Sequence, residues 1–292
     1  MFTIPDMADI KIIPTLIREN FIKPQFPREP EPDLIMDSSI NVEAYKNAGE
    51  DAREMGANYL FQIEEISKVI KHCTTVIDLA CGPATILCMI AELNPKIQFV
   101  GVDLSEEMLA LAKQTVQQKG LKNVAFQKMD ISNLVGIGTN SVDGVISTMA
   151  LHHLPTQNHL VSCFKEISRV VKSNGAIYLA DFTRLKSLKS VFYFAYRDRY
   201  LDHVFALDYE RSLRASFTFK EFRELAKKYL PASVCINKTY LVPVMMIVKT
   251  KSYPIDKEVL IKLKKRKKGF KFKFLMVYYE IKLFFFLGGL RD

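Results

Sequence analysis

Two apolar runs, separated by a turn of small residues and a helical segment, constrain this chain more than any other feature. The pattern predicts strands at residues 75–80 and 98–103 with a helix over 84–93 between them. A helix between consecutive strands is typical of a parallel pair, because parallel strands need a crossover connection. The turn after the first strand contains small residues at alternate positions: Ala80, Gly82 and Ala84.

The same alternation of strands and helices continues along the chain and predicts an α/β fold. Ser105 is a good N-cap for the next helix, and Thr218 with Glu221 forms a capping-box pattern. Two final apolar runs, 233–240 and 242–249, predict a closing pair of strands. The other expected strands are 124–129, 143–149 and 176–181, and the other expected helices are 105–119, 157–172 and 218–229.

The end of the second strand indicates the kind of ligand. Small residues in the first turn let a ligand approach the backbone, and Asp103 follows where a carboxylate accepts hydrogen bonds from ribose hydroxyls. The dinucleotide fingerprint G-x-G-x-x-G does not fit, because its glycine positions would be Ala80, Gly82 and Thr85. The sequence therefore predicts a pocket for a nucleoside-containing ligand other than a dinucleotide.

With the pattern D-x-(G/A)-x-G-x-(G/A) from Asp78 to Ala84, and Asp103 after it, the chain resembles the class I S-adenosylmethionine-dependent methyltransferases. The resemblance covers about residues 45–250. It implies a Rossmann-like, seven-stranded, mostly parallel sheet with helices on both faces and an antiparallel last hairpin. It also implies S-adenosylmethionine as cofactor and S-adenosylhomocysteine as product. The cofactor-binding residues that it implies are Asp78, Ala80, Gly82, Ala84, Asp103, Leu104, Asp130 and Ile131.

The resemblance gives these residues different roles. Asp78 orients the turn or approaches the methionine amino group, and Asp103 takes the ribose hydroxyls. Leu104 packs against adenine, while Asp130, with Ile131 beside it, accepts from the adenine amino group. Structural alternatives stay open, because Asp78 fits a helix cap and acids that end strands are common turn residues.

Methyl transfer needs an aligned acceptor, exclusion of water and, where the acceptor holds its proton tightly, a base. The candidates are His152, His153 and His203, with Asp181 at the end of the fifth strand. The alternative is that His152 and His153 only hold the loop. The five cysteines are scattered without a C-x-x-C pair, so we expect no metal site and a reduced, cytoplasmic setting.

Composition divides the chain into three parts. Residues 1–40 contain half of the twelve prolines and predict an extended arm. Residues 41–250 form the predicted methyltransferase domain, which begins with helical spacing over 41–72. Its insert at 182–217 is rich in aromatic residues and arginine, which predicts an acceptor lid. A helical pair whose aromatic side chains are ordinary core is the alternative.

The last part, residues 251–292, is a basic and aromatic tail. Residues 261–273 carry eight of the 41 lysines and arginines and no acid, so the net charge of +9 belongs mainly to the tail. We expect residues 261–290 to bind an anionic membrane surface, and the chain cut near residue 260 to fold alone. The alternatives are that the tail docks on its own domain or on a second copy of the chain in a homodimer. The nearly neutral remainder argues against nucleic acid.

Together these features predict methyl transfer to a small-molecule or acyl/lipid-like acceptor, free or bound to a carrier, in a biosynthetic pathway. The expected location is the cytoplasm, with the tail on the inner face of the membrane. Two alternatives are a non-catalytic S-adenosylmethionine-binding scaffold recruited to membranes and, with less support, an RNA methyltransferase.

Overall fold

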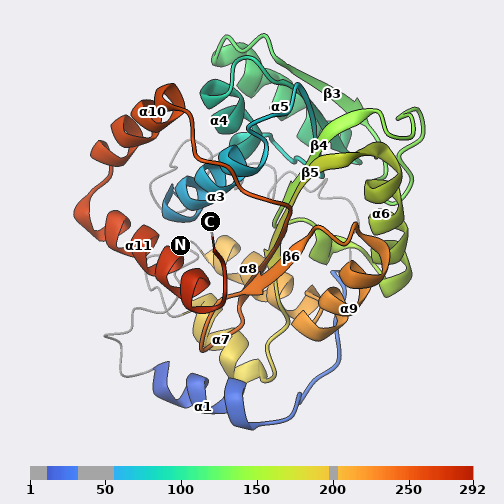
Figure 1. Ribbon diagram of the computed structural model, residues 1–292. Coiled ribbons are helices and arrows are strands. Elements are labelled where there is room, and N and C mark those ends of the chain that lie inside the picture. The colour runs from blue at the N-terminus through green and yellow to red at the C-terminus, as the bar shows by residue number, and fades with distance from the viewer. Residues whose placement is uncertain (1–11, 32–55, 197–202, 292) are drawn as a thin grey trace.

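The computed structural model describes residues 12–31, 56–196 and 203–291 (Figure 1). A seven-stranded sheet in the order β3-β2-β1-β4-β5-β7-β6 forms its centre. The strands are β1 (Thr75–Leu79), β2 (Gln98–Asp103), β3 (Val124–Lys128), β4 (Val142–Thr148), β5 (Val171–Phe182), β6 (Cys235–Lys238) and β7 (Met245–Lys249).

The first five strands pair in parallel, whereas β7 runs antiparallel to β5 and β6 antiparallel to β7. This confirms the expected mostly parallel sheet with an antiparallel last hairpin. Four of the five residues of β1 are buried, because helices cover both faces of the sheet. β5 begins at Val171, before its expected start, because Val171 pairs with Val142 across an irregular register.

Helices cover both faces of this sheet (Figure 1). α3 (Gly56–Val69), α4 (Thr85–Leu93), α10 (Lys257–Lys268) and α11 (Phe272–Leu287) pack together on one face, and α6 (Gln157–Val170) and α9 (Phe219–Tyr229) lie on the other. The remaining helices are α1 (Ile13–Phe21), α5 (Glu106–Gln118), α7 (Leu188–Tyr196), α8 (His203–Ala215) and the short 3-10 helix η2 (Leu151–His153).

Helix caps lie where the sequence predicts them. The hydroxyl of Ser105 accepts the backbone N–H of Met108 at 3.1 Å at the start of α5. Thr218 and Glu221 form a reciprocal capping box at the start of α9. These local interactions fix where each helix leaves the sheet, and so they position the residues at the strand ends.

The expectation of an extended arm is wrong for residues 13–21, which form α1. Pro14 lies in the first turn of that helix, where its missing N–H would have no partner in any case. Residues 22–31 form neither a helix nor a strand, and residues 32–40 lie outside the described residues, as does the first part of the segment 41–72.

The insert at 182–217 contains α7 and α8, with residues 197–202 outside the described ranges. Phe194 of α7 and Tyr209 of α8 are buried in the main core, as the alternative of a helical pair predicts. Phe205 of α8 faces the pocket described below. The insert therefore combines ordinary core residues with residues that line the pocket.

The tail packs on the domain. The ring of Phe285 in α11 stacks on Phe61 of α3 with centroids 5.2 Å apart, and Tyr278 and Ile281 are fully buried. Every residue of α3 is buried because the sheet lies on one side of it and the tail on the other. The expectation of a separable tail is therefore wrong. Within the described ranges, no helix has the length and apolar character needed to cross a membrane.

A buried acid also ties the tail to α3. The carboxylate of Glu64 accepts hydrogen bonds from Lys267 at 2.7 Å, Lys282 at 2.8 Å and the Tyr278 hydroxyl. Burial alone would raise the pKa of Glu64, but these donors lower it to about 2. The carboxylate is therefore ionised and paired at neutral pH.

Replacing Phe285 with alanine should destabilise the whole fold. The ring is fully buried, so we expect a loss of about 3–5 kcal/mol in the free energy of unfolding. Phe286→Ala is the matched control, because that ring is 54% exposed and its loss should cost less than about 1 kcal/mol. Urea unfolding followed by circular dichroism measures both, and equal losses would contradict the docking of the tail.

Candidate active site

The turn after β1 has the conformation that a closely approaching ligand requires. Ala80, Gly82 and Ala84 all have positive φ, at 52°, 52° and 60°. Glycine adopts this left-handed conformation without strain, whereas an alanine costs about 1 kcal/mol there. Ala84 is the N-cap of α4, and no side chain caps that helix. The first N–H groups of α4 are therefore left for a ligand.

Asp103 closes the other side of the turn. Its carboxylate accepts the backbone N–H of Gly82 at 2.8 Å and that of Ser105 at 3.0 Å. Burial raises the pKa of Asp103 above its ordinary value, although these N–H groups oppose the shift. Each oxygen keeps a further lone pair, so the carboxylate can accept from two ribose hydroxyls.

Asp78, near the end of β1, is only 4% exposed. Burial raises the pKa of this carboxyl well above its ordinary value, and the charge of Asp103 adds to the shift. A buried acid of this kind is stabilised when a cation binds beside it. The methionine amino group, which the resemblance implies near Asp78, would supply that cation.

The remaining expected cofactor residues lie as follows. Leu104, Asp130 and Ile131 line the same pocket as Asp78 and Asp103. Asp130 also accepts the N–H and hydroxyl of Ser132, each at 2.7 Å, so it is partly a turn residue. Ala84 is fully buried and does not line the pocket, because its role is to begin α4.

The pocket continues from this cofactor half to a second half beneath α8. The second half is lined by the end of β4, the η2 turn, the end of β5 and one face of α8. Its lining residues include Tyr59, Met149, His152, His153, Phe182, Phe205, Asp208 and Ser212. The expected cofactor residues and the histidine turn therefore line one continuous pocket.

His152 is the most constrained polar residue of the second half. Its Nδ1 lies 2.6 Å from Oδ1 of Asp181, and its backbone N–H donates to Oδ2 at 2.8 Å. Both side chains are only about 2% exposed. The Nε2 atom of His152 is buried without a hydrogen-bond partner among the described residues.

The charge of Asp181 controls the protonation of His152. Burial alone would lower the pKa of the imidazole, but the Asp181 carboxylate raises it above its ordinary value, with Glu31 and Asp208 adding to the effect. Asp181 also accepts the N–H of Phe182 at 2.7 Å, which fixes the carboxylate against the backbone. The ring of His152 is thus held through Nδ1, whereas Nε2 has no hydrogen-bond partner among the described residues.

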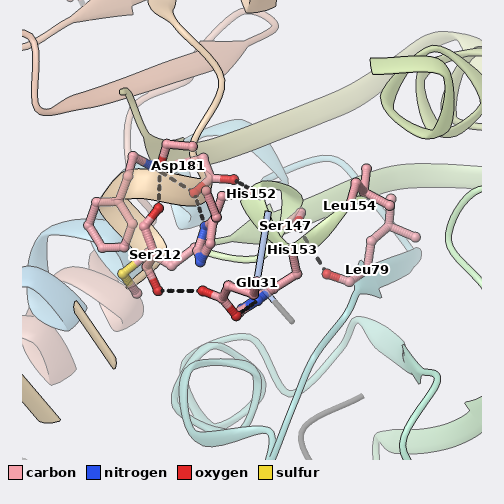
Figure 2. A network of polar contacts seen from close by, with 12 residues as sticks. Glu31, Leu79, Ser147, His152, His153, Leu154, Asp181 and Ser212 are labelled. Carbon is pink, nitrogen blue, oxygen red and sulfur yellow. Dashed lines mark hydrogen bonds and ion pairs between the residues drawn. The ribbon is translucent and has the colours of Figure 1, made fainter. Parts of the chain in front are cut away.

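His153 belongs to a second pair beside the first (Figure 2). Its Nδ1 lies 2.7 Å from Oε2 of Glu31, and Oε1 of Glu31 accepts the Ser212 hydroxyl at 3.1 Å. Burial alone would raise the pKa of Glu31, but His153 lowers it to about 2. The N-terminal segment, the η2 turn and α8 therefore meet at this carboxylate.

Arg28 fixes the same junction through the backbone. Its guanidinium donates to the carbonyls of His152 at 2.9 Å and Pro155 at 2.6 Å, and also to those of Leu154 and Ala215. Sequence reasoning missed both Arg28 and Glu31. The one signal was the charged, proline-fixed run from Arg28 to Glu31, and nothing local indicates contacts more than 120 residues away.

The structure does not bring His203 together with His152 and His153. His203 is exposed at the first residue of α8 and does not line the pocket. Phe205, Asp208 and Ser212 line it instead, and their spacing puts them on one face of the helix. His203 lies nearly opposite that face.

Glu31, His152 and His153 also form a cluster that could hold a metal ion, because each offers a ligand atom within 4.8 Å of the others. Imidazole and carboxylate groups suit zinc, iron and nickel. The sequence predicts no metal site, and the cluster was not visible in it because Glu31 is distant in the chain. Since His153 and Glu31 already pair with each other, a metal would have to displace that hydrogen bond.

The comparisons with known proteins agree with the family that the sequence resembles. Residues 70–242, more than half of the chain, match the methyltransferase domain family. The chain is 33% identical over 102 residues to the putative methyltransferase YqeM of Bacillus subtilis, over 35% of this chain and 40% of that protein. It is 25% identical over 173 residues to the demethylmenaquinone methyltransferase of Bacillus cytotoxicus, over 56% of this chain and 71% of that protein.

A solved structure shows the same fold. The plantazolicin methyltransferase BpumL, determined in complex with SAH, covers 81% of this chain and 88% of its own, with a TM-score of 0.58 and 16% identity. The chain therefore belongs to the methyltransferase domain family, within the class I enzymes that use S-adenosylmethionine.

Removing the carboxylate of Asp103 should weaken cofactor binding. Asp103→Ala deletes the acceptor of charge-assisted hydrogen bonds, so we expect a loss of about 1.5–3 kcal/mol in S-adenosylmethionine binding, tenfold or more in Kd. Asp103→Asn, which keeps one oxygen for the turn, should lose less. Glu107→Ala, an exposed acid in the same region, is the control. Calorimetry showing unchanged affinity in a folded Asp103→Ala variant would contradict the assignment.

Proposed function

We propose that this protein transfers the methyl group of S-adenosylmethionine to a small-molecule or acyl-type acceptor, with His152 as general base. One observation carries the proposal: the buried Nε2 of His152 has no partner among the described residues, while Nδ1 is held by Asp181. His152 lines the same pocket as Asp103, which supports a position near both cofactor and acceptor.

The chemistry needs little more than alignment and one proton acceptor. A lone pair of the acceptor attacks the methyl carbon, the carbon–sulfur bond breaks, and S-adenosylhomocysteine leaves with the electron pair. The proton of the acceptor passes to Nε2 of neutral His152, and the ionised Asp181 stabilises the imidazolium that results. Asp181 also sets the tautomer, because its carboxylate favours the proton on Nδ1 and leaves Nε2 as the base.

The acceptor half of the pocket favours a partly apolar acceptor with at least one polar group. Tyr59, Met149, Phe182 and Phe205 give it apolar walls. Its polar lining includes Asp208 and Ser212 on α8 as well as His152. Such a mixture is typical of sites for small organic molecules.

Among the relatives, one group is named for demethylmenaquinone and one solved structure for plantazolicin. Both names refer to molecules other than nucleic acid, which supports a small-molecule or peptide-like acceptor here. The match to YqeM spans only 35% of this chain and 40% of that protein, so it does not indicate an acceptor.

The alternative functions have weaker support. A scaffold that only binds S-adenosylmethionine needs no base, yet His152 lines the pocket and is paired with the buried Asp181. An RNA methyltransferase would use the cations of the tail, but two of them, Arg266 and Lys267, pair with Glu92 and Glu64 of its own domain, and the rest of the chain is nearly neutral. A metal at Glu31, His152 and His153 would provide a different route to an activated acceptor.

Purified protein incubated with methyl-labelled S-adenosylmethionine and a small-molecule extract tests the function. Label should appear in an extracted compound by mass spectrometry, and demethylmenaquinone can be assayed separately as one defined acceptor. Activity that survives a chelator would exclude the metal route. Label found only in RNA would contradict the proposal.

Replacing the base should separate catalysis from binding. His152→Ala should lower turnover of the labelled product about 100-fold while leaving S-adenosylmethionine affinity within a few-fold. His203→Ala is the control, because His203 is exposed on the opposite face of α8 and should keep full turnover. If both variants turn over normally, alignment and exclusion of water are sufficient and His152 is not the base.

The pH dependence of turnover should follow His152. The base is active only when neutral, and its pKa is raised above 6.5, so turnover should increase as pH rises through a value above 6.5. Asp181→Asn removes the charge that raises the pKa, so the rise should move to lower pH with a reduced plateau. Rate profiles of both proteins at saturating S-adenosylmethionine measure the shift. An unshifted profile would show that another group titrates.

A further inference from the structure

α11 is mostly apolar, with Glu280 and Lys282 among its few charged residues, although it lies at the surface of the molecule. One side is covered by α3 and is buried: Val277, Tyr278, Ile281, Phe284 and Phe285. A surface helix of a globular protein normally has a polar outer face, whereas a helix that is apolar all round is normally covered all round. The second side of α11 therefore requires an explanation.

That second side is a continuous exposed stripe. Its members recur at intervals of three and four residues along the whole helix: Phe272, Met276, Tyr279, Leu283, Phe286 and Leu287. Each is at least 47% exposed, and Phe272 reaches 78%. Single exposed apolar residues need no explanation, but a contiguous stripe of six marks an interaction surface.

A group of cations lies on the neighbouring helix and the turn that leads to α11. Figure 1 shows α10 and α11 following one another along the same side of the molecule. Lys264, Lys265, Lys268 and Lys271 are exposed, and no ion pair joins them to an acid among the described residues. Their neighbours on α10 are different, because Arg266 pairs with Glu92 and Lys267 with Glu64.

We propose that these four lysines and the six-residue stripe, here called the α10–α11 surface, bind the surface of an anionic lipid bilayer. The lysines supply attraction to lipid headgroups, and the stripe supplies side chains that enter the boundary between headgroups and acyl chains. α11 lies flat on the bilayer because its other side remains packed on α3.

Charge decides between a bilayer and a second copy of the chain. A symmetric dimer across this face would bring the same unpaired lysines of two copies together. The acids on these helices, Glu258 and Glu280, are fewer than the four lysines, so like charges oppose such an interface, and the whole chain carries a net charge of +9. An anionic bilayer has the complementary charge and an apolar interior for the stripe. The proposal does not depend on which acceptor is methylated.

Sedimentation of the full chain with lipid vesicles tests the surface. The protein should bind vesicles of phosphatidylcholine mixed with phosphatidylglycerol, and should bind those of phosphatidylcholine alone at least tenfold less. Added salt should release it, because salt screens exposed charges. Equal binding to both kinds of vesicle, or to neither, would overturn the proposal.

Two variants separate the charges from the stripe. Replacing Lys264, Lys265, Lys268 and Lys271 with glutamine should weaken binding to the mixed vesicles at least tenfold. The control replaces four exposed lysines elsewhere, so it changes the net charge equally and should lose much less: Lys113, Lys122, Lys227 and Lys228. The variant Leu283→Ser with Phe286→Ser should also bind weakly while it keeps S-adenosylmethionine affinity.

A tryptophan reporter shows whether the stripe itself enters the lipid. The chain has no tryptophan, so Phe286→Trp gives a single fluorescent probe, and Val135→Trp gives a control at another exposed apolar position. Only the Phe286→Trp emission should shift to the blue with mixed vesicles. A dimer in light scattering that Leu283→Ser and Phe286→Ser convert to monomer, without vesicle binding, would overturn the proposal and assign the face to a second copy.

Discussion

The parallel pairing of β1, β2, β4 and β5 is the constraint on which the site depends. Parallel strands end at the same edge, so Asp78, Asp103 and Asp181 come together although more than a hundred residues separate the first from the last. The edge is shielded from water by helices, which makes each carboxylate costly unless it is paired. Asp103 accepts hydrogen bonds from backbone N–H groups, and Asp181 pairs with His152. Burial raises the pKa of Asp78, so a cation bound beside it would stabilise its charge.

The acceptor half is assembled from parts of the chain that are distant in sequence. Arg28 and Glu31 reach the η2 turn from the N-terminal segment, and Ser212 reaches Glu31 from α8. These contacts hold His152 and His153 at the pocket, with Nε2 of His152 buried and without a hydrogen-bond partner among the described residues. α3 also connects distant parts of the chain, because its Tyr59 lines the pocket and its Phe61 stacks on Phe285 of the tail. The site and the α10–α11 surface therefore share one buried helix.

The sequence predicts the sheet and the conformation of the turn after β1 well because both depend on local patterns. The turn from Ala80 to Ala84, Asp103 and the caps at Ser105 and Thr218 lie where those patterns put them. Long-range packing decides the rest. His203 was misplaced because its helical face is set by the packing of α8, and Glu31 has no local signal. Membrane binding of the tail was preferred over docking on the domain because a mostly apolar helix has the same composition in both cases.

The tautomer of His152 tests the central claim most directly. Nitrogen-15 NMR of histidine-labelled protein distinguishes Nδ1–H from Nε2–H, and a His152→Gln variant assigns the signal among the five histidines. We predict that neutral His152 carries its proton on Nδ1 and none on Nε2. Nε2 should become protonated as the pH falls, with a pKa above 6.5. A neutral form protonated on Nε2, or a ring that titrates below 6.5, would contradict it.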